Sequence, residues 1–291
     1  MRIIHGAFLI QGKSPDGDSI RFVPDDPTLF DDLYRRHRMK FSADGSIQLR
    51  LEGIDTPETH YGVQAQPYGE TARDALLTAL GYKVDKIKFG NGGVVSNDGG
   101  QSPRGAIATS GADANGRPIS FVFAAGSEPA ADGTDLFVTD AHAKSTANYA
   151  LLAAGHAYPG LYTSMWTKLR GVFRAAAVAA RSAGTGIWTL DASADFRLET
   201  QDDIGPDGVL ILPKLFRRAT DYLKDVDKGF DGNLSDWINS KSSGSRPEND
   251  LVLLNDGTAN AVEVPFATLI EQRNANVSLT VDVCTIAFVE K

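Results

Sequence analysis

Residues 47–59 constrain the fold most, because they read as a strand that ends in a cluster of charged side chains. Apolar and polar residues alternate in the first half of this segment, which is the period of a strand with one buried face. Gly53 then interrupts the row, and Pro57 restricts the residue before it to an extended backbone. Arg50 and Asp55 are an odd number of positions apart, so on a regular strand they would face opposite sides. We therefore predict a bulge or coil near Gly53.

The pattern on either side of this strand predicts short strands followed by helices. Apolar spacing of the helical kind occurs at 67–80, 145–154 and 166–183. Strand-like segments without such spacing occur at 3–12, 17–24, 82–89, 105–110 and 118–125. This order of elements indicates a mixed fold in which helices lie beside a small sheet or barrel.

Two segments look like insertions between these elements. Residues 25–44 combine helical spacing with a basic run at 35–40, and residues 90–112 are rich in Gly, Asn and Ser. The basic run is either a patch that contacts phosphates or the solvated face of a short helix, which is the commoner role of such runs. We expect both insertions to border a functional site and to narrow or extend its groove.

The composition changes after residue 190. A polar linker is followed by a helical pattern at 213–226 and by strand-like runs at 209–212, 251–254, 261–268 and 277–289. Residues 191–291 contain 10 Lys and Arg against 18 Asp and Glu, which accounts for the whole net charge of −8. We predict two domains, one over residues 1–190 and an acidic, mostly β accessory domain over residues 191–291 whose role no motif indicates.

Four short motifs occur in a fixed order. They are Asp16-Gly-Asp-Ser19, Asp55-Thr-Pro-Glu58, Asp113-Ala-Asn-Gly-Arg117 and Gly186-Ile-Trp188. Taken together, they make residues 1–190 resemble the staphylococcal nuclease (thermonuclease) family. The resemblance implies an α+β fold with an OB-fold-like five-stranded β-barrel and three helices, and OB folds commonly bind nucleic acids. It also implies that Asn148 ties a helix to the barrel.

The resemblance implies a metal site with oxygen ligands. Asp18 and Asp55 would bind Ca²⁺ through their carboxylates and Thr56 through its carbonyl, while Asp16 would orient water. Ca²⁺ accepts about 6–8 oxygen ligands in loose geometry, which suits such a set.

The resemblance also implies which residues bind the phosphate and which one takes up the proton. Glu58 matches the general base, and a positioned carboxylate can take a proton from the attacking water. Arg50 and Arg117 match the arginines that grip the phosphate, because a guanidinium offers paired donors to two oxygens. Tyr162 is the aromatic residue that we expect near the nucleotide.

We therefore predict a Ca²⁺-dependent nuclease that hydrolyses DNA, RNA or both, prefers single strands and leaves 3′-phosphates. The alternative is a non-catalytic OB-fold module that binds nucleic acid or protein. A further hypothesis is that the acidic segment 191–291 regulates the enzyme by covering a basic groove. Because the chain as a whole is acidic, either binding to nucleic acid is local and metal-assisted, or the substrate is short or single-stranded.

The sequence gives few indications of compartment. No apolar run reaches the length of a membrane span, and the apolar N-terminus has no cleavage site and reads as a first strand. Cys284 is the single cysteine and cannot form an internal disulfide. We expect a cytoplasmic location by default and no membrane partner.

Overall fold

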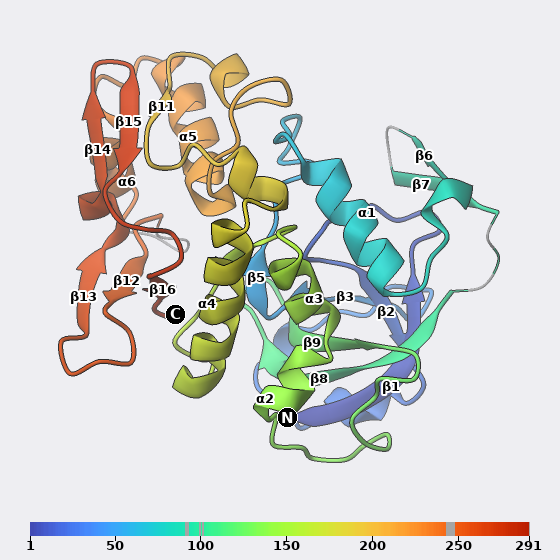
Figure 1. Ribbon diagram of the computed structural model, residues 1–291. Helices are drawn as coiled ribbons and strands as arrows, with labels where there is room; N and C mark the ends of the chain where they lie inside the picture. Colours follow the sequence, from blue (N-terminus) through green and yellow to red (C-terminus); the bar gives the residue numbers. More distant parts are fainter. Residues whose placement is uncertain (91–92, 99, 101, 243–247, 291) are drawn as a thin grey trace. The chain divides into compact units, whose positions relative to one another are not determined.

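The computed structural model describes residues 1–90, 93–98, 100, 102–242 and 248–290 (Figure 1). The chain divides into two compact units. The first unit contains Met1–Ile54 and Thr71–Leu151, and the second contains Asp55–Glu70 and Leu152–Lys291. The short segment 55–70, from the middle of the N-terminal half, thus belongs to the same compact unit as the C-terminal residues. The predicted domain boundary at residue 190 remains a prediction.

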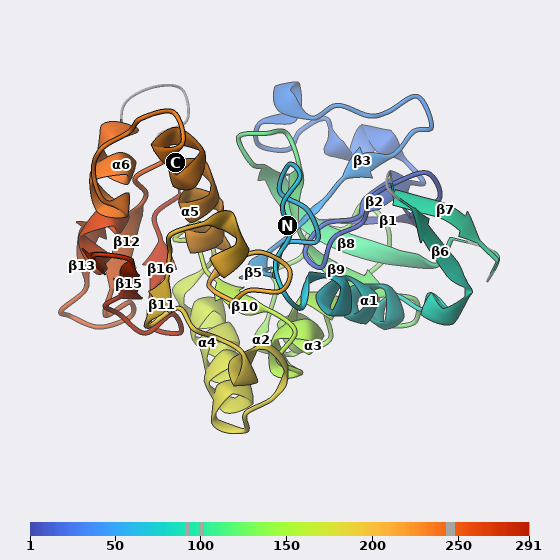
Figure 2. The same ribbon diagram turned by 90° about the horizontal axis from the view of Figure 1, so that it is seen from above.

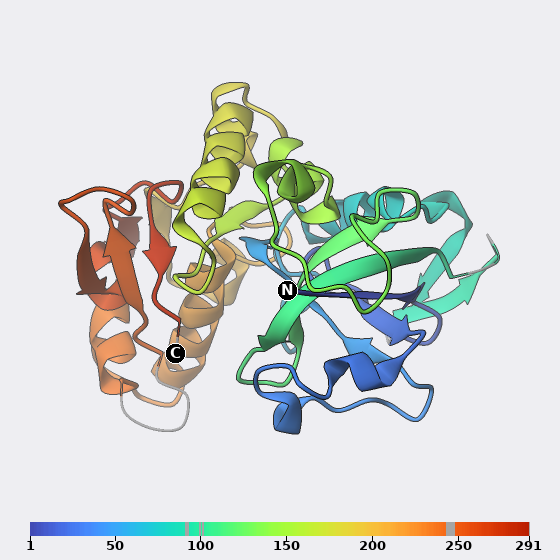
Figure 3. The same cartoon turned by 90° about the horizontal axis from the view of Figure 1, so that it is seen from below.

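The first unit is built on a sheet that curls into a nearly closed barrel, which confirms the predicted barrel (Figure 3). This sheet has six strands where the resemblance implies five, because the segment at 47–55 is broken and contributes β3 and β4 separately. The strand order is β3-β2-β1-β8-β9-β4, in which β1 pairs antiparallel with β2 and β8, and β4 runs parallel to β9. Phe8, Phe22, Phe121 and Phe123 are among the buried side chains of this unit. The strands are β1 (Arg2–Leu9), β2 (Arg21–Pro24), β3 (Ile47–Gln48), β4 (Arg50–Leu51), β8 (Arg104–Ala112) and β9 (Pro118–Ala124).

The predicted distortion near Gly53 is confirmed. The segment that reads as one strand is broken into β3, β4 and β5 (Gly53–Asp55). Gly53 has a φ of 80°, a left-handed conformation that glycine adopts without the steric penalty of a side chain. The side-chain alternation that holds up to Leu51 therefore does not continue to Asp55.

The helices predicted at 67–80 and 145–154 form as α1 (Gly69–Ala79) and α3 (Ala147–Ala153). A further short helix, α2 (Asp140–Lys144), lies outside the predicted ranges. Asn148 on α3 is fully buried, and its side-chain oxygen accepts a hydrogen bond from Val122 N at 2.8 Å. Its amide nitrogen donates to Glu52 O and Ser120 O, both at 2.9 Å. These bonds confirm that Asn148 ties the helix to the barrel.

The two insertions form short elements. Residues 25–44 contain two 3₁₀ turns, Pro27–Phe30 and Arg36–Arg38, instead of the single helix that the spacing predicts. In the other insertion, a 3₁₀ turn at Val84–Lys86 leads into a hairpin of β6 (Ile87–Gly90) and β7 (Gly93–Asn97). Part of the second insertion, residues 91–92, 99 and 101, lies outside the described residues.

The second unit combines helices with two small sheets (Figure 2). Helices α5 and α6 pack together, and α6 contacts β14. The sheets have the orders β11-β15-β14 and β13-β12-β16. The helical segments are α4 (Thr167–Ser182), α5 (Pro213–Val226) and α6 (Leu234–Ser240), with 3₁₀ turns at Gly186–Thr189, Gln201–Asp203 and Phe266–Leu269. The strands are β10 (Tyr158–Gly160), β11 (Phe196–Arg197), β12 (Leu251–Leu254), β13 (Val262–Pro265), β14 (Ile270–Arg273), β15 (Asn276–Leu279) and β16 (Ala287–Phe288).

The region after residue 190 is strand-rich, as expected, and α5 matches the predicted helix at 213–226. One prediction in this region is wrong. Residues 209–212 are not a strand, although Leu210, Ile211 and Leu212 are buried. Leu210 forms only an isolated bridge to Asp191, because the chain enters α5 at Pro213, which suits the first turn of a helix.

Several long-range bonds join the C-terminal residues to the rest of the second unit. Phe288 N donates to Leu161 O at 2.8 Å, and Thr163 N donates to Phe288 O at 2.9 Å. Asp256, whose side chain is 1% exposed, accepts from Arg170 and Arg174 on α4. Residues after 190 are therefore part of the structure that holds α4.

Within the described residues, no helix combines the length and the apolar composition that crossing a membrane requires.

Candidate functional site

In the first unit, the turn that contains Asp16 and Asp18 lies against β4. Leu51 N donates to Asp18 O at 2.8 Å, so the backbone of Asp18 adjoins the strand that carries Arg50. Asp16 is buried, and its Oδ1 accepts from Gly17 N at 2.8 Å. The first unit thus brings the motif at residues 16–19 beside the strand that carries Arg50.

Arg117 follows the turn between β8 and β9 and is oriented by Asp113. Oδ1 of Asp113 accepts from the backbone nitrogens of Asn115 and Arg117, both at 2.9 Å. Oδ2 of Asp113 accepts from Arg117 Nε at 2.9 Å and lies 2.8 Å from Nη2. Since Asp113 is buried, the turn holds the guanidinium in one direction. The sequence motif included Asp113 but gave it no role.

The insertion 25–44 packs on the same hairpin (Figure 3). Tyr34 N donates to Ser110 O at 3.0 Å, and Ala112 N donates to Tyr34 O at 3.1 Å. Arg38 Nη1 donates to Ala114 O at 3.0 Å. The basic run therefore borders the Arg117 hairpin, and its role in contacting phosphates remains a prediction.

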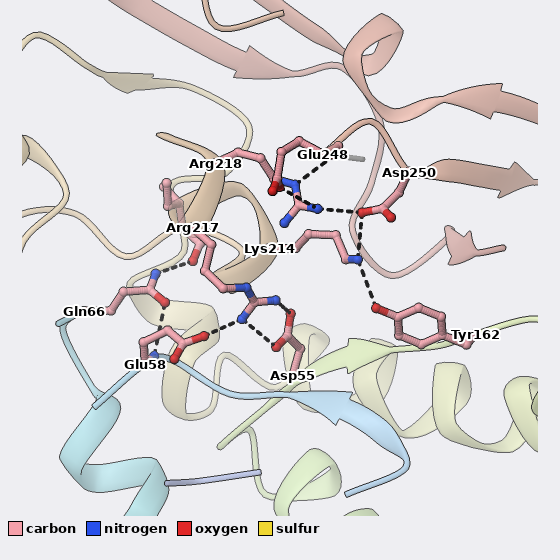
Figure 4. Close-up of polar contacts among 10 residues, drawn as sticks. Asp55, Glu58, Gln66, Tyr162, Lys214, Arg217, Arg218, Glu248 and Asp250 are labelled. Atoms are coloured by element: carbon pink, nitrogen blue, oxygen red, sulfur yellow. Dashed lines mark hydrogen bonds and ion pairs between the residues drawn. The ribbon is translucent and has the colours of Figure 1, made fainter. Parts of the chain in front are cut away.

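In the second unit, Asp55 and Glu58 share one cation, the guanidinium of Arg217 on α5 (Figure 4). Arg217 Nη1 and Nη2 donate to the two oxygens of Asp55 at 3.2 and 3.1 Å, and Nη1 also donates to Glu58 Oε1. The side chains are 8%, 15% and 23% exposed for Asp55, Glu58 and Arg217. Burial alone would lower the pKa of Arg217, but the two carboxylates outweigh it and raise the pKa well above its ordinary value.

The rest of segment 55–70 is anchored to α5 and to the residues before it. Gln66 is buried, its Oε1 accepts from Glu58 N at 3.2 Å, and its Nε2 donates to Ile211 O at 2.7 Å. Tyr61 OH donates to Asp221 on α5 at 2.5 Å. These contacts fix the backbone on which Glu58 stands, so α5 positions this segment as well as pairing with its acids.

A second charged cluster lies on the neighbouring positions of α5 (Figure 4). Lys214 Nζ donates to Asp250 Oδ2 at 3.0 Å and to Tyr162 OH at 2.9 Å. Arg218 donates to the same Asp250 oxygen at 2.8 Å. The hydroxyl of Tyr162 thus accepts a hydrogen bond from Lys214, and its expected place near a nucleotide stays a prediction.

Residues 48–190 match the family model described as Staphylococcal nuclease homologue. These residues form a staphylococcal nuclease homologue domain. The matched range contains Arg50, Asp55, Glu58 and Arg117, while Asp18 precedes it. No curated protein matches the chain. The family resemblance that the motifs carry is confirmed.

The nuclease homologue domain has oxygen donors of the type that a hard cation prefers. Thr56 is buried beside Asp55 in the chain, and its Oγ1 forms no hydrogen bond among the residues that the structure describes. In the same described ranges, no group of three or more His, Cys, Asp or Glu side chains is arranged to hold a metal ion. Because Arg217 binds both oxygens of Asp55, this carboxylate does not fit a metal ion while the arginine is in place.

Sequence reasoning missed two residues of this site, Arg217 and Gln66. Both residues form hydrogen bonds with residues more than 140 positions away in the chain. Gln66 also lies in a loop without a regular pattern. Arg217 lies inside the helix that Pro213 begins and is followed by Arg218, and no motif distinguishes it from this neighbour.

Proposed function

We propose that the protein is a Ca²⁺-dependent nuclease that hydrolyses phosphodiester bonds of DNA, RNA or both. It would prefer single strands and leave 3′-phosphates. The observation that carries this proposal is the family match over residues 48–190, which contains Arg50, Glu58 and Arg117. Each of these side chains has the chemistry that its proposed role requires.

The proposal assigns proton transfer to Glu58. Water attacks phosphorus, its proton passes to the Glu58 carboxylate, and the bond from phosphorus to the 5′-oxygen breaks. The 5′-oxygen takes up a proton from solvent as it leaves, Glu58 returns its proton to solvent, and the phosphate stays on the 3′-oxygen. Gln66 supports this role, because it holds the backbone nitrogen of Glu58.

Arg50 and Arg117 are the proposed phosphate ligands. A guanidinium donates two parallel hydrogen bonds and stabilises the charge that develops on the phosphate oxygens. The orientation of Arg117 by Asp113 lowers the entropy that it would lose on binding.

The proposal assigns metal binding to Asp18, Asp55 and the Thr56 carbonyl. Ca²⁺, when bound, would neutralise charge on the phosphate. Arg217 binds both oxygens of Asp55, so this carboxylate already has a cation that the metal would have to replace.

Degradation of single-stranded DNA with Ca²⁺, with Mg²⁺ and with a chelator tests the proposal. We expect turnover with Ca²⁺, 3′-phosphate ends on the products, and a decrease in kcat of about 10²–10⁴-fold in Glu58→Gln. Glu271→Gln removes an exposed carboxylate of the second unit and should leave turnover unchanged. Unchanged activity in both Glu58→Gln and Arg50→Ala would exclude the assignment.

The second candidate is a non-catalytic module that binds nucleic acid or protein. The pairing of Asp55 and Glu58 with Arg217 favours it, because carboxylates that stay bound to a guanidinium would be poor ligands for a metal and poor acceptors of a proton. Salt-dependent DNA binding without cleavage at any divalent ion concentration would support this candidate.

A further inference from the structure

Arg217 uses the same oxygens that the proposed metal requires. Its two terminal nitrogens bind both oxygens of Asp55, and one of them also binds Glu58 (Figure 4). Resting on the proposed function, we propose that Arg217 is an internal competitor of Ca²⁺, and that the metal binds Asp55 only after the guanidinium has left this carboxylate. Helix α5 would thus set the Ca²⁺ concentration at which the nuclease becomes active.

The charges explain why the two cations exclude each other. Asp55, Glu58 and Arg217 together carry a net charge of −1 in a largely buried setting, where interactions are screened less than in water. Without the arginine, two neighbouring carboxylates would repel each other. With both cations present, Ca²⁺ and the guanidinium would repel each other across the same oxygens. One cation at a time balances the pair.

The helix presents Arg217, and not its neighbours, to the pair. Lys214 and Arg218 bind Asp250, so these two charges are held on another part of the unit. Gln66 and Tyr61 attach segment 55–70 to the start and the far end of the same helix. The fold therefore places Arg217 beside the two acids. Its side chain remains partly exposed, so the guanidinium can move from the acids into solvent.

This competition reduces the apparent affinity for the metal. The observed affinity falls by the fraction of molecules in which Arg217 has left the pair, because only those molecules can bind Ca²⁺ at these oxygens. By linkage, Ca²⁺ weakens the contact between Arg217 and Asp55 by the same factor. The mechanism differs from the hypothesis that acidic residues cover a basic groove, since here a basic residue of the C-terminal region neutralises acids.

Calorimetric titration of the full chain with Ca²⁺ tests the proposal without using activity. Arg217→Gln should bind Ca²⁺ at least tenfold more tightly than the wild type. The matched control is Arg273→Gln, which makes the same change at an 88% exposed side chain of the second unit and should stay within twofold of the wild type. Equal affinity in the wild type and Arg217→Gln, or no Ca²⁺ binding to folded Arg217→Gln, would overturn the proposal.

A second measurement covers the case in which Arg217→Gln does not fold. Arg217→Lys keeps the charge but loses the fork that binds both Asp55 oxygens, so it should bind Ca²⁺ more tightly than the wild type does. In the wild type, the Nε–H resonance of Arg217, assigned by its loss in Arg217→Lys, should shift as Ca²⁺ is added. A resonance that stays in place while Ca²⁺ binds would also overturn the proposal.

Cleavage assays separate this inference from the proposed function. If Arg217→Gln binds Ca²⁺ more tightly but neither protein cleaves DNA, the nuclease assignment fails and the competition stands. If both proteins cleave with the same Ca²⁺ dependence, the competition fails and the nuclease assignment stands.

Discussion

Arg117 and Arg217 are both paired with carboxylates, but the two units make these pairs in different ways. Arg117 binds Asp113, four positions earlier in the same hairpin of the first unit. Arg217 binds Asp55 across 162 positions and Glu58 across 159 in the second unit. The first pair orients a predicted phosphate ligand within a turn. The second joins the predicted catalytic segment to a C-terminal helix.

The comparison shows what the acidic C-terminal residues do. In the second unit, Asp256 binds Arg170 and Asp282 binds Arg181, and both arginines lie on α4. Part of the negative charge after residue 190 therefore neutralises basic residues of the nuclease homologue domain inside one compact unit. The acidic composition of residues 191–291 suggests a separate accessory domain. The same composition results when acidic residues of this region bind the basic side chains of α4.

Truncation after residue 190 should have the largest effect. It removes Arg217, Asp256 and strand β16, which bind segment 55–70, α4 and residues 161–163. Breaking one buried ion pair costs about 3–5 kcal/mol, and whole domains are stable by only about 5–15 kcal/mol. We expect the truncated chain to lose near-UV circular dichroism and protease resistance in residues 152–190. A truncated chain that unfolds with the same cooperativity as the full chain would refute the conclusion that residues after 190 hold the second unit together.

Asp256→Ala should have the next largest effect. The side chain is 1% exposed, and its loss leaves the buried Arg170 without its carboxylate partner. We expect the free energy of unfolding in urea to fall by about 3–5 kcal/mol. In the first unit, Asp135→Ala breaks an exposed pair with Arg2 and should cost only about 0–1 kcal/mol. If Asp256→Ala and Asp135→Ala lowered the free energy of unfolding equally, the ion pairs of the second unit would be no more stabilising than those of the first.

The same pair predicts how stability depends on pH. The hydrogen bond from Arg170 holds the pKa of Asp256 below its ordinary value of 3.8. Between these values the unfolded chain binds more protons than the folded one, so the stabilisation is complete above 3.8 and is lost as the pH falls through the folded pKa. Urea titrations at several pH values should show this acid loss in the wild type and a smaller loss in Asp256→Asn.

Asp113→Asn should have the smallest effect. The amide oxygen can still accept from the backbone nitrogens of Asn115 and Arg117, but the amide nitrogen that replaces Oδ2 cannot accept from the guanidinium, so the pair with Arg117 is lost while the turn is kept. Because Arg117 is half-exposed, we expect the free energy of unfolding to change by about 0–1 kcal/mol. A few-fold rise in KM for DNA would indicate that Asp113 positions Arg117. A loss of several kcal/mol would place the local pair in the same energetic class as the buried pairs.

Local signals explain which features the sequence predicts correctly. The break at Gly53, the helix at 213–226 and the hairpin before Arg117 each depend on residues close together in the chain. Residues 209–212 were mistaken for a strand because four apolar residues predict burial but not hydrogen-bond pairing. The Arg217 pairs leave no trace in spacing or composition, since their partners are separated by more than half of the chain.

This long separation has a consequence for synthesis. A ribosome adds about 5–20 residues per second, so the 162 positions between Asp55 and Arg217 correspond to roughly 10–30 s. During that time the nascent chain carries the proposed catalytic segment without the helix that anchors it. The first unit can begin to form early, whereas segment 55–70 has to wait for α5. If the protein is a nuclease, its proposed catalytic segment is anchored only after the ribosome, which itself is made largely of RNA, has added Arg217.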